Sequence, residues 1–234
     1  MTETYNYWFH QFNFPDQNGK PYKYNGGEFK KDKITGNLIP IDWEIRPIND
    51  LISLLSGFSF STEFYRENGS YKLLTIKNVQ EHEINLNPCN FINEIPKNMP
   101  EFCLLKKKDI LISLTGNVGR TGIVFTDNCL LNQRLALIKT VRTDLIAYIF
   151  NLFKGEYLKK KMNAISNGSA QKNLSPLDVE KILIPWNSDI QKMFSNKFNL
   201  SVELIVNNLE EIHKLQKLKE YLLPLLMNGQ ATID

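Results

Sequence analysis

Short apolar runs with alternating polar positions fill the middle of the chain and indicate β-strands. Glycine, proline and asparagine separate the runs, as expected for turns between strands. The runs with this pattern are 71–79, 109–115, 122–126 and 135–141.

Two segments of the same region have apolar residues at helical spacing instead. They are 48–55 and 144–162, and the second carries Leu145, Ile149, Leu152, Phe153 and Leu158. Ser175 followed by Pro176 is typical of a helix start, with serine at the cap and proline in the first turn. Strands mixed with separate helices predict an α+β fold, one globular domain with a mixed or antiparallel β core.

Residues 188–228 have the pattern of one long helix. It begins after Pro185 with a cap supplied by Ser188 or Asp189, and Pro224 ends or kinks it. From Asp189 to Leu223 it would measure about 50 Å at 1.5 Å per residue. Apolar residues recur in it at spacings of three and four, which is typical of a coiled-coil seam. These residues are Phe198, Val202, Ile205, Leu209, Ile212, Leu215, Leu218 and Leu222.

This helix carries a longer apolar stripe than a domain of about 150 residues can cover. We therefore expect a second copy of the chain to pack its own helix on this one, as an antiparallel coiled coil about a two-fold axis. The alternative is a helix folded back along its own domain.

Aromatic residues crowd the start of the chain and predict a segment that must dock on something. It packs either on its own domain and long helix or on a partner protein. The residues are Tyr5, Tyr7, Trp8, Phe9, Phe12 and Phe14. The expected division is an aromatic arm at 1–35, a globular domain at 36–187, the long helix at 188–228 and a tail at 229–234.

Composition adds bounds to this picture. The 234 residues are 42% hydrophobic, enough for a substantial core, and the net charge of +3 permits nucleic-acid binding without requiring it. Cys89, Cys103 and Cys129 have no CxxC spacing, which favours reduced thiols. With no signal-peptide pattern and no apolar run of roughly 18 residues, we expect a soluble, cytoplasmic protein without a membrane segment.

Motifs for catalysis are missing from the sequence. It contains no phosphate-binding loop and no dinucleotide fingerprint, and its three histidines are far apart. The run 87–90, Asn-Pro-Cys-Asn, lacks the second proline and the aromatic residue of an amino-methyltransferase tetrad, so we interpret it as a turn. We expect no reaction, no cofactor and no metal in this chain.

A glycine-rich turn carries the strongest functional pattern. In 111–123, one apolar strand enters a turn with three glycines and another leaves it, and Asn117, Arg120 and Thr121 project from that turn. Arg134 follows in the run 132–134. Arginine can bond guanine and asparagine can bond adenine bidentately, so such a turn suits reading the edge of a DNA duplex.

Other polar residues extend the candidate DNA-binding set. Lys77 and Asn78 end a strand, and the lysine runs 106–108 and 159–161 with Lys154 are candidates for phosphate contacts, although charge runs are often only solvated. The loop 163–173 is rich in amides and hydroxyls and could instead be structural. Its candidate residues are Ser169, Gln171, Lys172 and Asn173.

Several segments, in this order and spacing, resemble the DNA specificity subunits of type I restriction–modification systems. Taken singly, each is a weak pattern. The segments are 39–44, 56–60, 111–123 with 132–134, 168–175, 179–185 and 222–230.

The resemblance implies a single target-recognition domain that binds double-stranded DNA and catalyses nothing itself. It further implies methyltransferase subunits that take S-adenosylmethionine and a restriction subunit that takes ATP. Most family members have two such domains and two helices, so this half-length chain is expected to homodimerise and read a bipartite palindrome.

Some points stay open at this stage. Thr75 stands where relatives often have arginine, and the second half-subunit could be identical or different. A protein-interaction adaptor without DNA binding is the alternative function.

Overall fold

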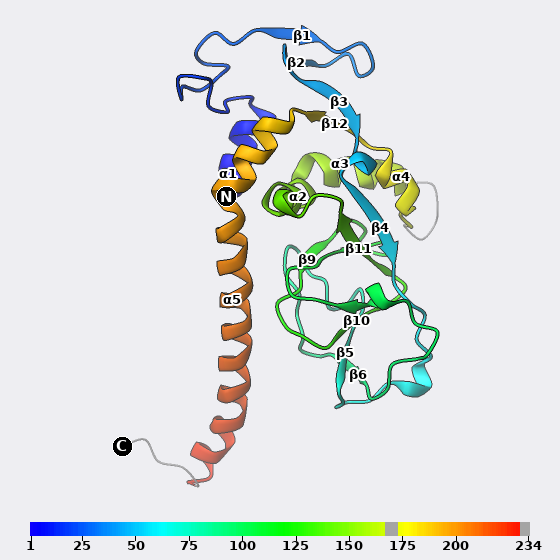
Figure 1. The fold of residues 1–234 in the computed structure, drawn as a ribbon. Helices are drawn as coiled ribbons and strands as arrows, with labels where there is room; N and C mark the ends of the chain where they lie inside the picture. The colour runs from blue at the N-terminus through cyan, green and yellow to red at the C-terminus, as the bar shows by residue number, and fades with distance from the viewer. Residues whose placement is uncertain (167–172, 230–234) are drawn as a thin grey trace.

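The computed structural model describes residues 1–166 and 173–229. A long helix stands beside a domain built from short strands, and smaller helices cover one end of that domain (Figure 1). The helices are α1 Thr2–Tyr5, α2 Ile146–Lys154, α3 Glu156–Ser166, α4 Pro176–Glu180 and α5 Ser188–Met227.

The strands are short and belong to several sheets. They are β1 Phe29–Lys31, β2 Leu38–Pro40, β3 Glu44–Pro47, β4 Ile52–Ser56, β5 Tyr71–Leu74, β6 Asn90–Ile92, β7 Leu104–Leu105, β8 Ile110–Ser113, β9 Thr121–Ile123, β10 Cys129–Leu131, β11 Leu135–Thr140 and β12 Leu183–Trp186.

Two four-stranded sheets form the centre of the domain. One has the order β4-β11-β8-β9 and is antiparallel throughout. The other has the order β6-β5-β10-β7 and contains one parallel pair, β5 with β10. The expected α+β fold with a mixed β core is therefore confirmed.

The helix predicted at 48–55 was wrong. Only the short 3₁₀ turn Ile48–Asp50 is helical, and β4 follows it, paired with β11. Ile52 and Leu54 are buried while Ser53 and Leu55 are less so, which is the period of two of a strand. The short apolar run fitted both periods, and pairing with β11 decided the outcome.

The helix predicted at 144–162 is divided at Gly155. Its backbone is extended there (φ −69°, ψ 139°), so α2 ends and α3 begins in a new direction. The short helix α4 begins at Pro176, after Ser175 as predicted, although no side chain caps it.

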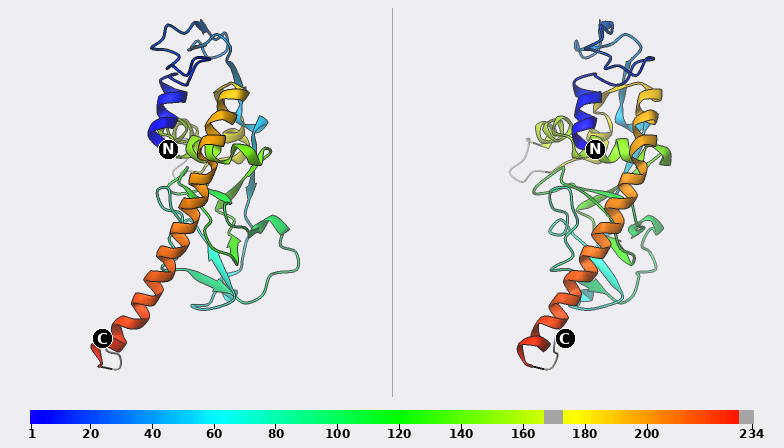
Figure 2. Two further views of the ribbon diagram at one scale, coloured as in Figure 1. Left: turned by 60° about the vertical axis from the view of Figure 1, so that its left-hand side comes forward. Right: turned by 90° about the vertical axis from the view of Figure 1, so that its left-hand side faces the viewer.

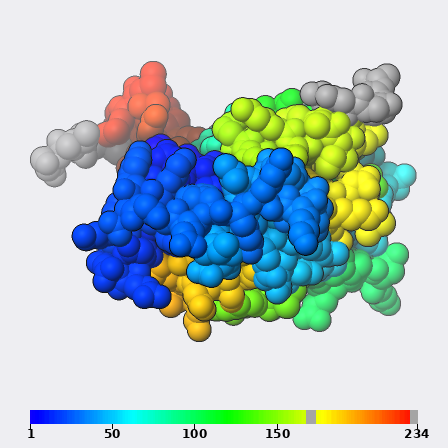
Figure 3. Space-filling model, turned by 90° about the horizontal axis from the view of Figure 1, so that it is seen from above, coloured from blue at the N-terminus to red at the C-terminus, as the bar shows by residue number. Residues whose placement is uncertain are grey.

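The aromatic arm packs on its own chain. Tyr5, Trp8 and Phe9 are buried, and the ring of Phe9 lies 4.9 Å from Tyr148 of α2 and 5.4 Å from Phe194 of α5. Seen from above, the first part of the chain covers that end of the molecule, over the start of α5 (Figure 3). The arm thus joins the domain and the long helix in one core.

Asn187, rather than Ser188 or Asp189, caps α5. Its side-chain oxygen accepts hydrogen bonds from the backbone N–H groups of Asp189 (3.1 Å) and Ile190 (3.2 Å), which satisfies two donors of the first turn. The helix runs along the domain and its last turns extend past it (Figures 1 and 2). Pro224 lies inside the helix and does not end it.

The first half of the predicted coiled-coil seam faces the chain's own domain, which corrects the assignment. Val202 is fully buried, and Phe198, Ile205 and Leu209 are partly buried against the same core. This part of α5 packs on α2, whose own apolar face needs covering. The corrected residues are Phe198, Val202, Ile205 and Leu209.

Candidate nucleic-acid interface

The glycine-rich turn between β8 and β9 is tied together by Ser113. Its hydroxyl donates to the carbonyl of Asn117 (2.5 Å) and accepts from the backbone N–H of Arg120 (3.0 Å). Gly116 and Gly119 have φ of +70° and +79°, which side-chain-bearing residues adopt at a cost. A Cβ on Gly119 would also lie 2.9 Å from the side chain of Met162. The turn is therefore conformationally restricted and packs against α3.

Arg120 is held in position on this turn. With its amide oriented to satisfy both groups, Asn117 accepts hydrogen bonds from the guanidinium at 2.8 and 3.3 Å. Gln80 accepts a further one, at 3.4 Å. No carboxylate lies within ion-pair distance of Arg120 among residues 1–166 and 173–229. The guanidinium is thus oriented by two amide oxygens rather than by an ion pair.

Backbone hydrogen bonds place the other predicted loops beside this turn in one row. The backbone N–H of Leu174 donates to the carbonyl of Leu114 (2.8 Å), and the backbone N–H of Leu114 donates to the carbonyl of Arg134 (3.0 Å). On the far side of the 132–134 turn, the N–H of Gln133 donates to Phe58 (2.9 Å). Asn173 also forms an isolated bridge with Thr115. We call this row, which consists of the 114–120 turn, the 132–134 turn, Phe58 and residues 173–174, the loop face.

Several predicted residues lie on or near the loop face with exposed side chains. Asn117, Arg134 and Asn173 belong to its loops, and Lys77 adjoins it, because the Lys77 carbonyl accepts from the same Gln80 that contacts Arg120 (2.7 Å). Ser169, Gln171 and Lys172 lie outside the described residues.

Asn78 and Thr121 are corrections to the predicted set, because both are buried. Asn78 accepts from the N–H and hydroxyl of Thr75 and donates to the carbonyls of Asn85 and Pro88, so its amide is fully used. Thr121 is 1% exposed, and its hydroxyl contacts the carbonyls of Gly119 and Phe153. Both side chains hold the fold together and cannot reach a ligand.

The loop 80–83 lies next to the glycine-rich turn and was missed from the sequence. Glu81 forms an ion pair with Lys159 of α3, and this hydrogen-bonded cation lowers the pKa of the Glu81 carboxyl. Burial, and next the charge of Lys154, lower the pKa of His82. His82 has a φ of +70°. No motif marks this four-residue loop, so only the folded chain brings it to the site.

The first lysine run lies at α5 rather than on the loop face. Lys107 pairs with Glu210 (2.8 Å) and Lys108 with Glu203 (2.5 Å). These two lysines therefore fasten the long helix to the domain, which corrects their assignment as phosphate contacts.

Metal-ligand geometry and thiol reactivity were the two kinds of chemistry that the cysteines, histidines and acidic residues could offer. No cluster of three or more histidine, cysteine or acidic side chains is placed to hold a metal ion there. Burial raises the pKa of Cys89 to about 11 and that of Cys129 to about 12, so both thiols stay protonated and unreactive at neutral pH. No helix of the described residues is long and apolar enough to cross a membrane.

Two specificity subunits of Methanocaldococcus jannaschii type I restriction enzymes are similar to this chain. Identity to the MjaVIII subunit is 27% over 214 residues, covering 88% of this chain and 49% of that protein. Identity to the MjaIX subunit is 25% over 238 residues, covering 99% and 52%. The chain thus spans about half the length of these curated relatives.

Solved structures of two such subunits have a similar fold. The S subunit of the type I restriction-modification system from M. genitalium matches with a TM-score of 0.52 at 19% identity, over 83% of this chain and 47% of that one. The HsdS subunit from Thermoanaerobacter tengcongensis matches with a TM-score of 0.52 at 16% identity, over 87% and 48%.

A model of a protein family also matches most of this chain. The model described as "Type I restriction modification DNA specificity domain" matches residues 40–193, a range that includes the glycine-rich turn and the loops beside it. Because this match covers more than half of the 234 residues, the chain belongs to the family of type I restriction-modification DNA specificity domains.

Proposed function

We propose that this chain recognises a short sequence in double-stranded DNA as the non-catalytic specificity component of a type I restriction–modification complex. The observation that carries the proposal is Arg120, a guanidinium held by Asn117 and Gln80 on a glycine-rich turn of the loop face, with no ion-pair partner among the described residues. A preorganised arginine loses little side-chain entropy when it binds, and its planar fork matches O6 and N7 of guanine.

The residues around Arg120 suit the other contacts of a DNA reader. Arg134 and Lys77 are exposed cations beside the turn and suit phosphates, while Asn117 and Asn173 present amides that suit base edges. Phosphate contacts would orient the domain, and the few groups on the glycine-rich turn would read the sequence.

Salt dependence of DNA binding tests this proposal. The purified chain should bind short duplexes with an affinity that falls steeply with salt, because bound phosphates release counterions. Genome-wide mapping of methylated positions, after co-expression with its methyltransferase subunits, should then give the target. Binding that ignores salt, or none at all, would point to a protein-interaction adaptor instead.

A second copy of the chain is the partner that we propose for α5. Exposed leucines lie on the side of the helix away from the domain, two near its middle and three in its last turns. Leu200, Leu204, Leu215, Leu218 and Leu222 are 66%, 54%, 57%, 50% and 37% exposed. Pairing two such stripes antiparallel would place one loop face at each end, and the two-fold axis would make the target an interrupted palindrome.

The length relation supports this pairing, since the chain spans 49% and 52% of two relatives. A different half-subunit with a similar stripe would fit equally and would give an asymmetric target. Methyltransferase and restriction subunits complete the proposed complex and supply its catalysis.

A further inference from the structure

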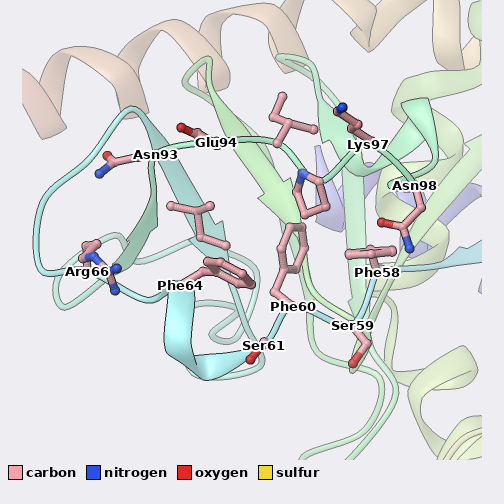
Figure 4. Close-up of a pocket in the computed structure, with 13 residues that line it drawn as sticks. Phe58, Ser59, Phe60, Ser61, Phe64, Arg66, Asn93, Glu94, Lys97 and Asn98 are labelled. Atoms are coloured by element: carbon pink, nitrogen blue, oxygen red, sulfur yellow. The ribbon is translucent and has the colours of Figure 1, made fainter.

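An aromatic hollow opens on the domain beside the loop face. Its volume is about 710 Å³, and three phenylalanines, Phe58, Phe60 and Phe64, form much of its wall. Figure 4 shows their rings together, with Arg66, Asn98 and Lys97 around them. None of these residues takes part in the contacts described above except Phe58, through its backbone.

The turn that carries the exposed ring of this hollow is braced by Arg66. Phe64 ends the 3₁₀ turn Thr62–Phe64 and is 56% exposed, whereas Phe60 is 6% exposed. The guanidinium of Arg66 donates to the carbonyls of Glu63 (2.7 Å) and Tyr65 (2.8 Å), which braces the turn. Phe64 is thus presented to solvent on a rigid support instead of packing into the core.

Charge around the hollow favours an anionic ligand. Arg66 and Lys97 line it, and neither forms an ion pair within the described parts of the chain, while Glu94 is the one acidic side chain in the wall. Asn98 adds an amide that can bond a base edge. Flat apolar rings, two cations and amides together match a nucleotide better than an aliphatic peptide, since bases stack on aromatic side chains and phosphates pair with cations.

The hollow is continuous with the loop face. Phe58 accepts from the backbone N–H of Gln133 (2.9 Å) and forms a bridge with Asn132, so the hollow begins where the 132–134 turn ends. A duplex lying on that turn would bring its backbone to the edge of the hollow. In Figure 1 the Thr62–Phe64 turn lies on the side of the domain away from α5, clear of the proposed helix pair.

We infer that this hollow receives one nucleobase displaced from the bound duplex, stacked on Phe64 with its phosphate beside Arg66 and Lys97. The inference rests on the proposed function, because it needs the duplex on the loop face. It adds to that function a site that selects DNA in which a base can leave the stack.

A bulged duplex tests the inference without knowledge of the target sequence. We would compare the affinity for a fully paired duplex with that for the same duplex carrying one looped-out thymine. The native chain should prefer the bulged duplex about tenfold, in the range expected for stacking one base on an aromatic ring. Phe64→Ala should remove that preference and keep the affinity for the paired duplex. Its ring is exposed, so the fold should survive.

Tyr24→Ala is the matched control, because Tyr24 is 75% exposed and belongs to the arm rather than to the hollow; it should leave the preference intact. A preference that is absent in the native chain, or that survives Phe64→Ala, would overturn the inference while paired-duplex binding still stood. Loss of all duplex binding in the native chain would instead overturn the proposed function.

Discussion

Arg120 illustrates how a single residue depends on its supports. Its guanidinium is oriented by Asn117 and Gln80, and its backbone by Ser113. The sequence identified Arg120 and Asn117 because glycines flank them, but nothing in the pattern marked Gln80. Thr121 was predicted from its place on the glycine-rich turn and Asn78 from its place at a strand end, and both proved to be buried and hydrogen-bonded inside. Which polar residue satisfies the interior is decided by contacts far away in sequence.

Arg120→Ala should weaken binding to the methylation-mapped target by about 1–3 kcal/mol, because a bidentate contact to a base is lost. Binding to unrelated duplexes should change little. Competition assays with target and random DNA measure both values. Arg46→Ala is the control, since Arg46 is an exposed arginine of β3 that pairs with Glu44 (2.7 Å). An equal loss on both DNAs would make Arg120 a phosphate contact.

Glu81→Gln should strengthen binding to random duplexes. The carboxylate occupies Lys159 and lies near Arg120, so it competes with DNA phosphates for their charge. Freeing Lys159 for one phosphate should steepen the slope of log affinity against log salt by about one. Titrations at several salt concentrations measure that slope. Glu83→Gln, in the same loop but without an ion pair among the described residues, should leave it unchanged.

At the scale of elements, α5 carries two apolar stripes that the sequence pattern merged into one. A step of three residues turns about 300° around the helix axis, about 60° less than a full turn. The two successive steps of three from Ile212 to Leu218 therefore move the apolar stripe away from the side that faces the domain. The stripe through Val202 and Leu209 packs on the domain, and the one through Leu215 faces solvent. Spacing predicted the helix and its bounds, but not which partner each stripe would cover.

His213 makes the packing of α5 sensitive to pH. Its ring lies 5.8 Å from Phe125, and its buried Nε2 has no hydrogen-bond partner among the described residues. Burial first, and then Lys217 and Lys72, lower its pKa, against a smaller opposite effect of Glu220. Protonation therefore favours the unfolded chain.

The free energy of unfolding should accordingly be highest above about pH 6.5 and fall as the pH drops toward the lowered pKa of His213. Denaturant titrations between neutral and mildly acidic pH measure the change. His10 and His82 have lowered pKa values too, so the native protein is compared with the His213→Gln variant. The variant should lose less free energy of unfolding on acidification than the native protein does. Parallel curves for the two proteins would contradict the assignment.

At the scale of the whole molecule, the division of α5 between two partners sets the geometry of a dimer. Ion pairs from Lys107 and Lys108 and the buried Val202 fix the angle of the helix to its own domain. The distance between two loop faces would then depend on the overlap of the outward stripes alone. Because α5 has 40 residues it measures about 60 Å, and a duplex turn measures about 34–36 Å, so we expect the half-sites to be separated by roughly one and a half turns.

The double substitution Leu215→Asp with Leu218→Asp should convert a dimer to a monomer, because it places charges on the outward stripe. Both side chains are at least half exposed, so the melting temperature at low protein concentration should hardly change. Sedimentation velocity measures the mass. Val202→Asp is the contrasting variant: it buries a charge in the domain's own core and should unfold the chain. If the native chain sediments as a monomer at every concentration, or the double variant stays dimeric, then the outward leucines do not pair two copies, and the spacing of the half-sites must be set by another subunit.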